Sequence, residues 1–472
     1  MDLEGETAPR VFDGPDQPAE PEALRRLVEG VRGVDLAAPP VVLPDFHHKR
    51  DMEMPSSITV ATRDAVRPIF TSSSVNCGMA LLAFDMEVPD RRAIESFYGS
   101  VLERYPHPPG RRKELSGGDV LAAATRGAEF AFDHWGLDEE ELERIEESGR
   151  VDLEPFGGAG DVRSTLPRMI VQLSRLRFGT IGPSNHFLEL QVVEEVMDRG
   201  AAARLGVRRG QVTLQYHAGG GVLAGQVGRL FGRRKKASRA VRAQMALQRP
   251  LHHLGSARSV SQARRRLELY FAGGPPSVSL SEPEGRRLML ANAAAMNYGF
   301  AFRVATYANL REMARRAFGP SESRLIVDSP HNSIYVEDVA GERAVVHRHN
   351  SCRAYPGWKM RQGTAFGDVG QALLLPGTNR TSSYLCVASG GAERALFSAC
   401  HGAGTVIEEF ERGGRSGPHP EGHRTLRFRY SGDAPTEVPH LDDRGVDSAL
   451  GVLVGSDIVR PVARMRPIAV LT

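Results

Sequence analysis

The chain has 472 residues, and its 60 basic and 57 acidic residues give a formal charge of +3. A hydrophobic content of 41% and a charged content of 25% exclude a disordered chain, a collagen-like chain and a small disulfide-rich scaffold. No apolar run approaches the roughly 18 residues that a membrane helix needs, and the first residues lack a signal-peptide pattern, so we expect a cytoplasmic protein. The four cysteines are far apart in the sequence, which argues against a disulfide framework or a zinc ribbon.

Helix-like and strand-like segments alternate along the first half of the chain. Residues 1–40 are expected to form an N-terminal arm, loose over its first twenty residues and with a short helix at 21–34. The acidic stretch 138–149 predicts a solvated helix. Apolar runs predict strands at these places: 60–70, 80–88, 169–176, 187–193 and 212–216.

The composition changes in the second half of the chain. Between Arg229 and Arg266 there are twelve basic residues and no acidic one. We predict that residues 225–275 form a helical segment that contacts a nucleic-acid backbone, with a solvated helical face as the alternative. Residues 284–318 predict one or two Ala-rich helices. No convincing linker divides residues 41–472, and the composition indicates mixed α and β structure.

Four histidines follow short apolar strands and lie next to small or amide residues: His186, His217, His331 and His401. Glycines after a strand allow the backbone to turn and to approach a ligand closely. Imidazole and thiolate are ligands for transition metals, so Cys77 and several of these histidines are candidates for one metal site. The alternative for each histidine alone is an ordinary turn or a buried, hydrogen-bonded side chain.

Two segments resemble phosphate-binding loops. Residues 376–383 follow an apolar run and offer backbone N–H groups, hydroxyls and one guanidinium, and His401-Gly402-Ala403-Gly404 is a shorter loop of the same kind. Neither matches a P-loop or a dinucleotide-binding fingerprint, and each is weak alone.

The order of the motifs is more specific than any one of them. The series runs from Asn76-Cys77-Gly78 through Gly179-Thr180-Ile181-Gly182, Asn185-His186-Phe187-Leu188-Glu189, the His217 glycine turn, His331-Asn332 and His347-Arg348 to the 376–383 loop and His401-Gly402-Ala403-Gly404. This series resembles the RtcB family of RNA ligases over nearly the whole chain, from about residue 41 to the C-terminus.

The resemblance implies an α+β fold, with one large catalytic domain of mixed β-sheets flanked by helices around a deep, metal-floored cleft. It also implies a reaction that uses GTP as a substrate and one or two Mn²⁺ ions as cofactors. An RNA end with a 3′-phosphate or 2′,3′-cyclic phosphate is joined to a 5′-hydroxyl end through a guanylylated histidine, which matches His401. The implied partners are RNA, GTP and, as an open alternative, an activating protein, but no membrane.

The resemblance also assigns roles to individual residues. The metal ligands implied by matching motifs are Cys77, His186, His217 and His331. The nucleotide contacts implied in the same way are Asn185, Glu189, Asn332, Pro376, Gly377, Thr378, Asn379, Ser383, Gly402, Ala403 and Gly404, with Glu189 selecting guanine. The residues expected to contact RNA are Arg233, Arg234, Lys235, Lys236 and Arg353.

The sequence also departs from the family pattern. Ser74 replaces an aspartate that would provide a metal ligand, Thr405 replaces an arginine, and the usual C-terminal lysine is absent. Asp45, Asp51 and Glu53 are candidates for supplying the lost oxygen ligand. Two alternatives to ligation therefore remain open: a phosphoesterase that opens cyclic phosphates, and a protein that binds RNA ends without joining them.

Overall fold

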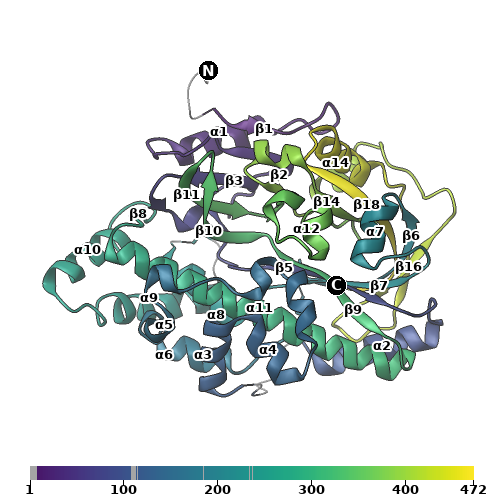
Figure 1. Cartoon of the computed structure of the whole chain (residues 1–472), viewed down its shortest axis with the longest axis horizontal. Coiled ribbons are helices and arrows are strands. Elements are labelled where there is room, and N and C mark those ends of the chain that lie inside the picture. Colours follow the sequence, from purple (N-terminus) through teal and green to yellow (C-terminus); the bar gives the residue numbers. More distant parts are fainter. Residues whose placement is uncertain (1–7, 108–112, 114, 184, 233, 236–237) are drawn as a thin grey trace.

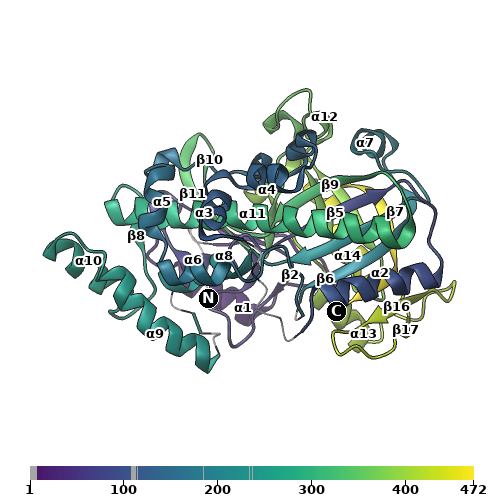
Figure 2. The same cartoon turned by 90° about the horizontal axis from the view of Figure 1, so that it is seen from below.

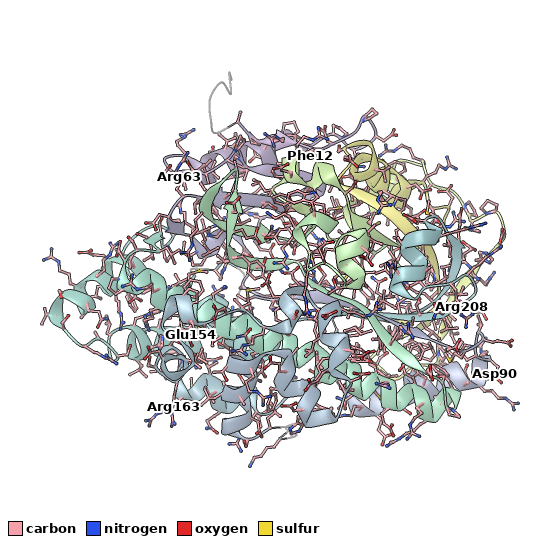
Figure 3. All side chains as sticks on the ribbon, in the orientation of Figure 1. Phe12, Arg63, Asp90, Glu154, Arg163 and Arg208 are labelled. Atoms are coloured by element: carbon pink, nitrogen blue, oxygen red, sulfur yellow. The ribbon has the colours of Figure 1, made fainter. Side chains whose placement is uncertain are left out.

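The structure of the chain is a computed structural model, and it describes residues 8–107, 113, 115–183, 185–232, 234–235 and 238–472. Helices surround two main β-sheets that lie side by side (Figures 1 and 2). The prediction of a mixed α and β fold is confirmed. Exposed charged side chains such as Arg63, Arg163 and Arg208 project from the outer surface (Figure 3).

The larger sheet has nine strands in the described part of the chain, and seven of them follow the order β13-β14-β18-β6-β7-β5-β9. β16 pairs with β18 at one end, and β17 pairs with β16. The strands are β5 (Gly78–Phe84), β6 (Phe187–Val196), β7 (Val212–Ala218), β9 (Ser323–Pro330), β13 (Ala372–Leu375), β14 (Ser383–Ala388), β16 (Arg424–Phe428), β17 (Thr436–Pro439) and β18 (Val459–Leu471).

Strand β5, which lies between β7 and β9, shows why this sheet forms. Its sequence, GMALLAF, is apolar at every position, which is typical of a strand that is covered on both faces. Ala80, Leu82 and Phe84 pack into the core that contains α11 (Pro283–Phe318). Met79 and Leu81 face a second core on the other side. The two-sided burial fixes the register of β5 and therefore the position of Cys77, which precedes it.

Among the described residues, the smaller sheet has five strands in the order β1-β2-β3-β11-β10. Its core is closed by α13 (Gly404–Arg412) and α14 (Arg444–Gly455), which pack against each other and against β2. Outside the main sheets, the structure describes two short strand pairs, and one of them is β12 with β15, the strand that leads to His401. The strands are β1 (Arg10–Val11), β2 (Val41–His47), β3 (Ser56–Thr62), β10 (Asn332–Val339), β11 (Glu342–His349), β12 (Ser351–Arg353), β15 (Ser398–Cys400), β4 (Ala65–Val66) and β8 (Val278–Ser279).

Helix α11 is the central helix of the fold and is buried along most of its length. It begins with Pro283, which suits the first helical position, and is followed by Gly319 at φ 90°, which suits its end. Alanines such as Ala291 and Ala295 allow neighbouring helices to approach closely. The other helices are α1 (Pro21–Val31), α2 (Arg91–Arg104), α3 (Gly117–Arg126), α4 (Ala128–Trp135), α5 (Ala159–Thr165), α6 (Arg168–Ser174), α7 (Arg199–Leu205), α8 (Gly221–Phe231), α9 (Arg239–His253), α10 (Val260–Tyr270) and α12 (Ala365–Val369).

The α9–α10 hairpin extends beyond the rest of the molecule on one side, as both views show (Figures 1 and 2). It belongs to the basic segment 225–275, which also includes most of α8. His252 and His253, at the end of α9, are buried against Arg287 of α11.

Three predictions about local structure were wrong. Residues 169–176 form helix α6 and not a strand, because Ile170, Val171 and Ser174 have helical spacing and are buried on one face. Residues 60–70 include only the end of β3, then β4 and a 3₁₀ turn at Pro68–Phe70, since proline lacks the N–H that a strand needs. Residues 138–149 form two 3₁₀ segments in which Glu146 is buried.

The described part of the N-terminal segment packs on the smaller sheet, and residues 1–7 of the predicted loose arm lie outside the described residues. β1 pairs in parallel with β2, and Phe12 is buried in the core under α14. Helix α1 buries Leu27 and Val31 on one face, as the spacing predicts. In the part of the chain that the structure describes, no helix combines the length and the apolar surface needed to span a bilayer.

Candidate functional site

Cys77, His186, His217 and His331 meet at one end of the larger sheet. Cys77 directly precedes β5, His186 directly precedes β6, and His217 lies in β7. The strand register places Met79 and Phe187 opposite His217, and Gly78 opposite Pro330. Residues up to 254 positions apart in the sequence therefore become neighbours because adjacent strands carry them to one edge.

Cys77, His186 and His217 form a cluster that can hold a metal ion. Cys77 Sγ lies 3.2 Å from His217 Nε2 and 3.7 Å from His186 Nε2. One ligand atom from each residue lies within 4.8 Å of the other two. His217 Nδ1 is 2.8 Å from the carbonyl oxygen of Asn185 and donates to it, which leaves Nε2 directed at the thiol as an electron-pair donor.

His331 connects this cluster to His401. Its ring centroid lies 4.9 Å from that of His217 and 4.4 Å from that of His401. His331 Nδ1 and His401 Nδ1 are both buried and make no hydrogen bond within the described part of the chain. Buried polar atoms are usually satisfied, so these two nitrogens are available to a ligand.

Burial controls the charge of this site. It lowers the pKa of His186 to about 4, and it lowers the pKa of His401 to about 4 against an opposing hydrogen bond with the Asn350 backbone. Burial also raises the pKa of the Cys77 thiol to about 11, an effect that a hydrogen bond with Ser74 reduces. The imidazoles are therefore neutral at pH 7, as metal ligands and nucleophiles must be.

The donor set fits a transition-metal dication. One sulfur and several imidazole nitrogens are borderline to soft ligands, which bind such metals better than they bind Ca²⁺ or Mg²⁺. The same set binds Zn²⁺ more tightly than Mn²⁺ at equal concentration, so it does not by itself select manganese.

An ion pair beneath the cluster supports Cys77. Arg303 of α11 donates from Nη2 to Asp328 Oδ1 at 2.6 Å and from Nε to both carboxylate oxygens. Its Nη1 donates to the carbonyl oxygen of Asn76, the residue before Cys77. Asn76 has φ 56°, so this contact holds a strained backbone position in place.

The 376–383 loop lies beside the loop that follows His401. A Cβ atom built on Gly402 would lie 3.7 Å from Pro376 Cγ. The first loop is closed by its own hydrogen bonds, from Gly377 N to Ser383 Oγ at 3.1 Å and from Thr378 N to Thr381 Oγ1 at 2.8 Å. The two phosphate-loop candidates thus adjoin the site that contains His401.

A family model described as tRNA-splicing ligase RtcB matches residues 31–472. The chain belongs to the RtcB family. The tRNA-splicing ligase RtcB of Pyrococcus furiosus is 29% identical over 413 residues, which cover 84% of this chain and 39% of the relative. That of Thermococcus kodakarensis is 27% identical over 452 residues, covering 91% and 86%. The RNA-splicing ligase RtcB of Mycobacterium bovis is 28% identical over 364 residues, covering 73% and 74%. The chain thus spans less than half the length of the Pyrococcus relatives.

The nucleotide contacts expected from the RtcB resemblance differ in exposure. Asn185 is exposed, whereas the Asn332 side chain is buried and accepts a hydrogen bond from Asn350 N at 3.0 Å. Glu189 is buried in β6 and accepts from Gln191 Nε2 at 2.7 Å. Burial raises the pKa of Glu189 to about 8, against that hydrogen bond. Its guanine contact and the deep cleft of the RtcB fold remain predictions.

The three carboxylates considered as substitutes for the missing RtcB aspartate have different surroundings. Asp45 Oδ1 accepts from Thr405 N at 2.7 Å, next to the first turn of α13. Glu53 pairs with Arg234 and accepts from Lys235 N. Both carboxylates are therefore engaged elsewhere in the protein, and the metal-binding cluster found among the described residues includes none of these three side chains. Ser74 itself lies near the cluster, where its carbonyl accepts from Cys77 N at 3.1 Å.

Two of the residues predicted to contact RNA lie in the interior. The Arg353 side chain is 5% exposed, pairs with Glu146 and Glu147 and lies over the Tyr355 ring. The Arg234 side chain is 4% exposed and donates to the carbonyls of Thr71 and Pro68. Lys235 is exposed, and Arg233 and Lys236 lie outside the described residues. Both buried arginines are bonded within the protein, and their contact with RNA remains a prediction.

Two further histidines near His401 were not predicted as site residues. His47 Nδ1 lies 3.1 Å from Thr405 Oγ1, just beyond the His401 loop. His349 is buried, and its Nδ1 has no hydrogen-bond partner among the described residues. His349 follows an apolar strand as the predicted histidines do, and this signal could have identified it.

Proposed function

We propose that the chain is an RNA ligase that uses GTP and Mn²⁺. It joins an RNA 3′-phosphate or 2′,3′-cyclic phosphate end to a 5′-hydroxyl end through a guanylylated His401. The observation that supports this most strongly is the His401 ring, 4.4 Å from His331, which itself lies 4.9 Å from His217 of the metal cluster. A nucleophile next to a metal-binding cluster is the arrangement that nucleotidyl transfer needs.

Each residue has a role in the proposed reaction. A neutral nitrogen of His401 attacks the α-phosphorus of GTP, a P–N bond forms, and the bond to the pyrophosphate oxygen breaks. The 376–383 loop and Gly402–Gly404 provide backbone N–H groups to the phosphates. Cys77, His186, His217 and His331 would hold the metal, which when bound stabilises the negative charge on the phosphoryl oxygens.

Transfer to RNA completes the proposed cycle. At a 2′,3′-cyclic phosphate end, water first attacks the phosphorus and the P–O2′ bond breaks, which leaves a 3′-phosphate and a 2′-hydroxyl. The guanylyl group then passes from His401 to the RNA 3′-phosphate, and the P–N bond breaks as the new phosphate–phosphate link forms. The 5′-hydroxyl oxygen then attacks the activated 3′-phosphorus and GMP leaves. The hydroxyl proton needs an acceptor, and His47 and His349, which both interact electrostatically with His401, are the candidates.

Labelling with GTP tests the proposal. Wild-type protein incubated with α-labelled GTP and Mn²⁺ should acquire an acid-labile label, and His401→Ala should acquire none. His134→Ala is a matched control, because His134 is exposed on α4, outside the candidate site. Absence of label on the wild-type protein would contradict the proposal.

A cyclic-phosphate phosphoesterase is the second candidate, and the substitution at Ser74 favours it. Loss of a carboxylate removes a negative charge that a second cation would need, while the Cys77 cluster remains. Conversion of a 2′,3′-cyclic phosphate end to a 3′-phosphate end, without label on His401, would support this candidate. RNA binding without either activity would indicate a protein that only binds RNA ends.

A further inference from the structure

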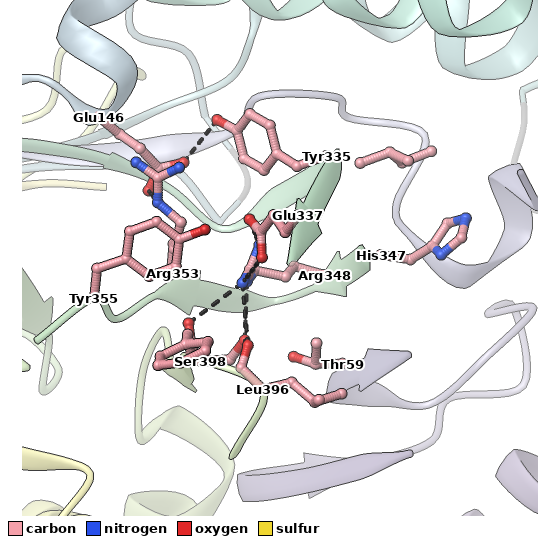
Figure 4. A network of polar contacts seen from close by, with 12 residues as sticks. Thr59, Glu146, Tyr335, Glu337, His347, Arg348, Arg353, Tyr355, Leu396 and Ser398 are labelled. Carbon is pink, nitrogen blue, oxygen red and sulfur yellow. Dashed lines mark hydrogen bonds and ion pairs between the residues drawn. The ribbon is translucent and has the colours of Figure 1, made fainter. Parts of the chain in front are cut away.

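A buried ion pair lies beside the strand that leads to His401. The side chains of Glu337 in β10 and Arg348 in β11 meet in the smaller sheet, although the strand register places Ser333 opposite Arg348 (Figure 4). Arg348 donates from Nη1 to Glu337 Oε1 at 2.7 Å and from Nη2 to Oε2 at 2.9 Å. The side chains are 0% and 6% exposed, so water contributes little to either charge.

The remaining donors of Arg348 hold a turn. Its Nε donates to Ser398 Oγ at 2.9 Å, and its Nη2 lies 3.2 Å from the carbonyl oxygen of Leu396 and 3.3 Å from that of Phe397 (Figure 4). Leu396 and Phe397 have φ values of 51° and 50°. Residues with side chains rarely adopt this conformation, so the turn persists only while surrounding contacts hold it.

The turn controls where His401 lies. Ser398 begins β15, and His401 follows the end of β15 directly. β15 pairs with β12, with Ser351 opposite Cys400, and Ser351 N donates to the carbonyl oxygen of His331 at 3.0 Å. The positions of His331 and His401 are therefore linked through this short strand pair. A slip of β15 by one residue would turn His401 to the opposite face.

A contribution to stability alone does not explain why this position carries a buried ion pair. A buried ion pair often contributes no net stability compared with apolar residues of the same size, because both charges lose their hydration. Arg348 uses its planar fork at three acceptors besides Glu337, which a lysine cannot do. The geometry therefore indicates that the pair specifies the shape of the turn.

We propose that Glu337 and Arg348 are positioning residues for His401, and that they hold the Leu396–Ser398 turn so that the imidazole faces His331 and the bound nucleotide. This inference rests on the proposed function of His401 as the nucleophile. Neither residue touches the substrate in this proposal. Misplacing the nucleophile by about 1 Å lowers the rate of transfer, and it need not weaken nucleotide binding.

Three variants test the proposal. Ser398→Ala removes one contact of Arg348 and the hydrogen bond from Ser398 Oγ to the Leu396 carbonyl oxygen at 3.0 Å, and it leaves the ion pair intact. Arg348→Lys removes the fork and leaves the Ser398 hydroxyl in place. Arg266→Lys is the matched control, because Arg266 forms another buried pair, with Glu284 at 2.8 Å, between α10 and α11. The measurements are the rate of His401 labelling at saturating GTP, the GTP concentration for half-maximal rate, and the thiolate–cobalt absorption band of Co²⁺-loaded protein.

We expect the saturating rate to fall roughly 10- to 100-fold in Ser398→Ala and further in Arg348→Lys. The half-saturating GTP concentration and the cobalt band should not change, and Arg266→Lys should label at the wild-type rate. An unchanged rate in both test variants would overturn the proposal. So would an equal loss in Arg266→Lys, because the effect would then be general destabilisation.

Hydrogen exchange separates this inference from the proposed function. Amide exchange across residues 396–401 should be faster in Ser398→Ala and Arg348→Lys and unchanged in Arg266→Lys. If the wild-type protein acquires no label, the proposed function fails and exchange alone decides whether the pair holds the turn. Unchanged exchange in both test variants would overturn the inference in that case.

Discussion

The candidate site around Cys77 and His401 differs from the α9–α10 hairpin in how its basic residues are used. Around the site, Arg303 and Arg348 are fully buried, and each is paired with one carboxylate and bonded to backbone carbonyls. On the hairpin, Arg239, Arg242, Arg258 and Arg264 are exposed, and Arg264 pairs with Glu268 on the surface. The first group fixes the backbone next to catalytic candidates, whereas the second group faces solvent, where a polyanion can reach it.

The basic segment 225–275 itself contains both buried and exposed basic residues. Arg234 and Arg266 belong to the run of basic residues, yet both side chains are buried and bonded within the protein. A run of like charges in a sequence therefore does not define a binding surface. Among the basic residues of this segment, only those that face solvent are suited to contact RNA. We therefore assign the RNA contact to the outer face of the hairpin.

The largest expected effect is the loss of the buried pair at Cys77. Arg303→Met leaves the Asp328 carboxylate buried without its partner, which should lower the free energy of unfolding by about 3–5 kcal/mol. Adding Asp328→Leu should recover most of that loss, because two apolar side chains need no hydration. Equilibrium urea unfolding of the metal-free protein measures both effects.

The exposed pair of Arg315 with Glu312 provides the control. Arg315→Met should leave the urea midpoint unchanged, because solvent already screens this pair. A small shift in Arg303→Met, comparable to that in Arg315→Met, would contradict the role assigned to the buried pair.

The sequence predicts the site better than it predicts the support around it. Cys77 and the four histidines could be found because their order and the small or amide residues beside them match the RtcB motifs. The structure places Cys77 and His186 just before a strand, His217 within one, and His331 and His401 just after one. Arg348 could not be assigned its role, because its partners Leu396, Phe397 and Ser398 are about 50 positions away and adopt a conformation that their side chains do not indicate. Helix α6 was mistaken for a strand because a seven-residue apolar segment carries too few turns to show its period.

The second prediction concerns how acid affects the contact of His252 and His253 with Arg287, which attaches the α9–α10 hairpin to α11. His252 Nε2 and His253 Nδ1 both accept from Arg287, at 2.5 Å and 3.4 Å, and acceptance requires neutral rings. Burial first, and then Arg287, lower the pKa of His252 to about 3 and of His253 to about 2. The other charged or titratable groups around the two rings are Glu284, Arg266, Arg249 and Tyr270.

The sign of this pH effect follows from proton uptake. Below about pH 6.5 the unfolded segment binds protons that the folded one excludes, so the stability is complete above that pH and is lost as the pH falls. Each histidine should contribute a loss of about 1.4 kcal/mol per pH unit. Hydrogen exchange of the α9 and α10 amides at pH 7.5 and pH 5.5, corrected for intrinsic rates, measures the loss. His253→Gln, which cannot titrate, should reduce it, and equal protection at both pH values would contradict it.

The smallest expected effect is on the salt dependence of RNA binding. Replacing Arg239, Arg258 and Arg264 with Gln should reduce the slope of log affinity against log salt by about 0.7 for each phosphate contact that is lost. Fluorescence anisotropy of a labelled single-stranded RNA with a 3′-phosphate, at several salt concentrations, measures the slope. Arg315 and Arg316, which are exposed at the far end of α11, provide the matched control, and their replacement with Gln should leave the slope unchanged. An equal change in both variants would mean that net charge and not the hairpin governs binding, whereas an unchanged slope in the hairpin variant would exclude its outer face as the RNA surface.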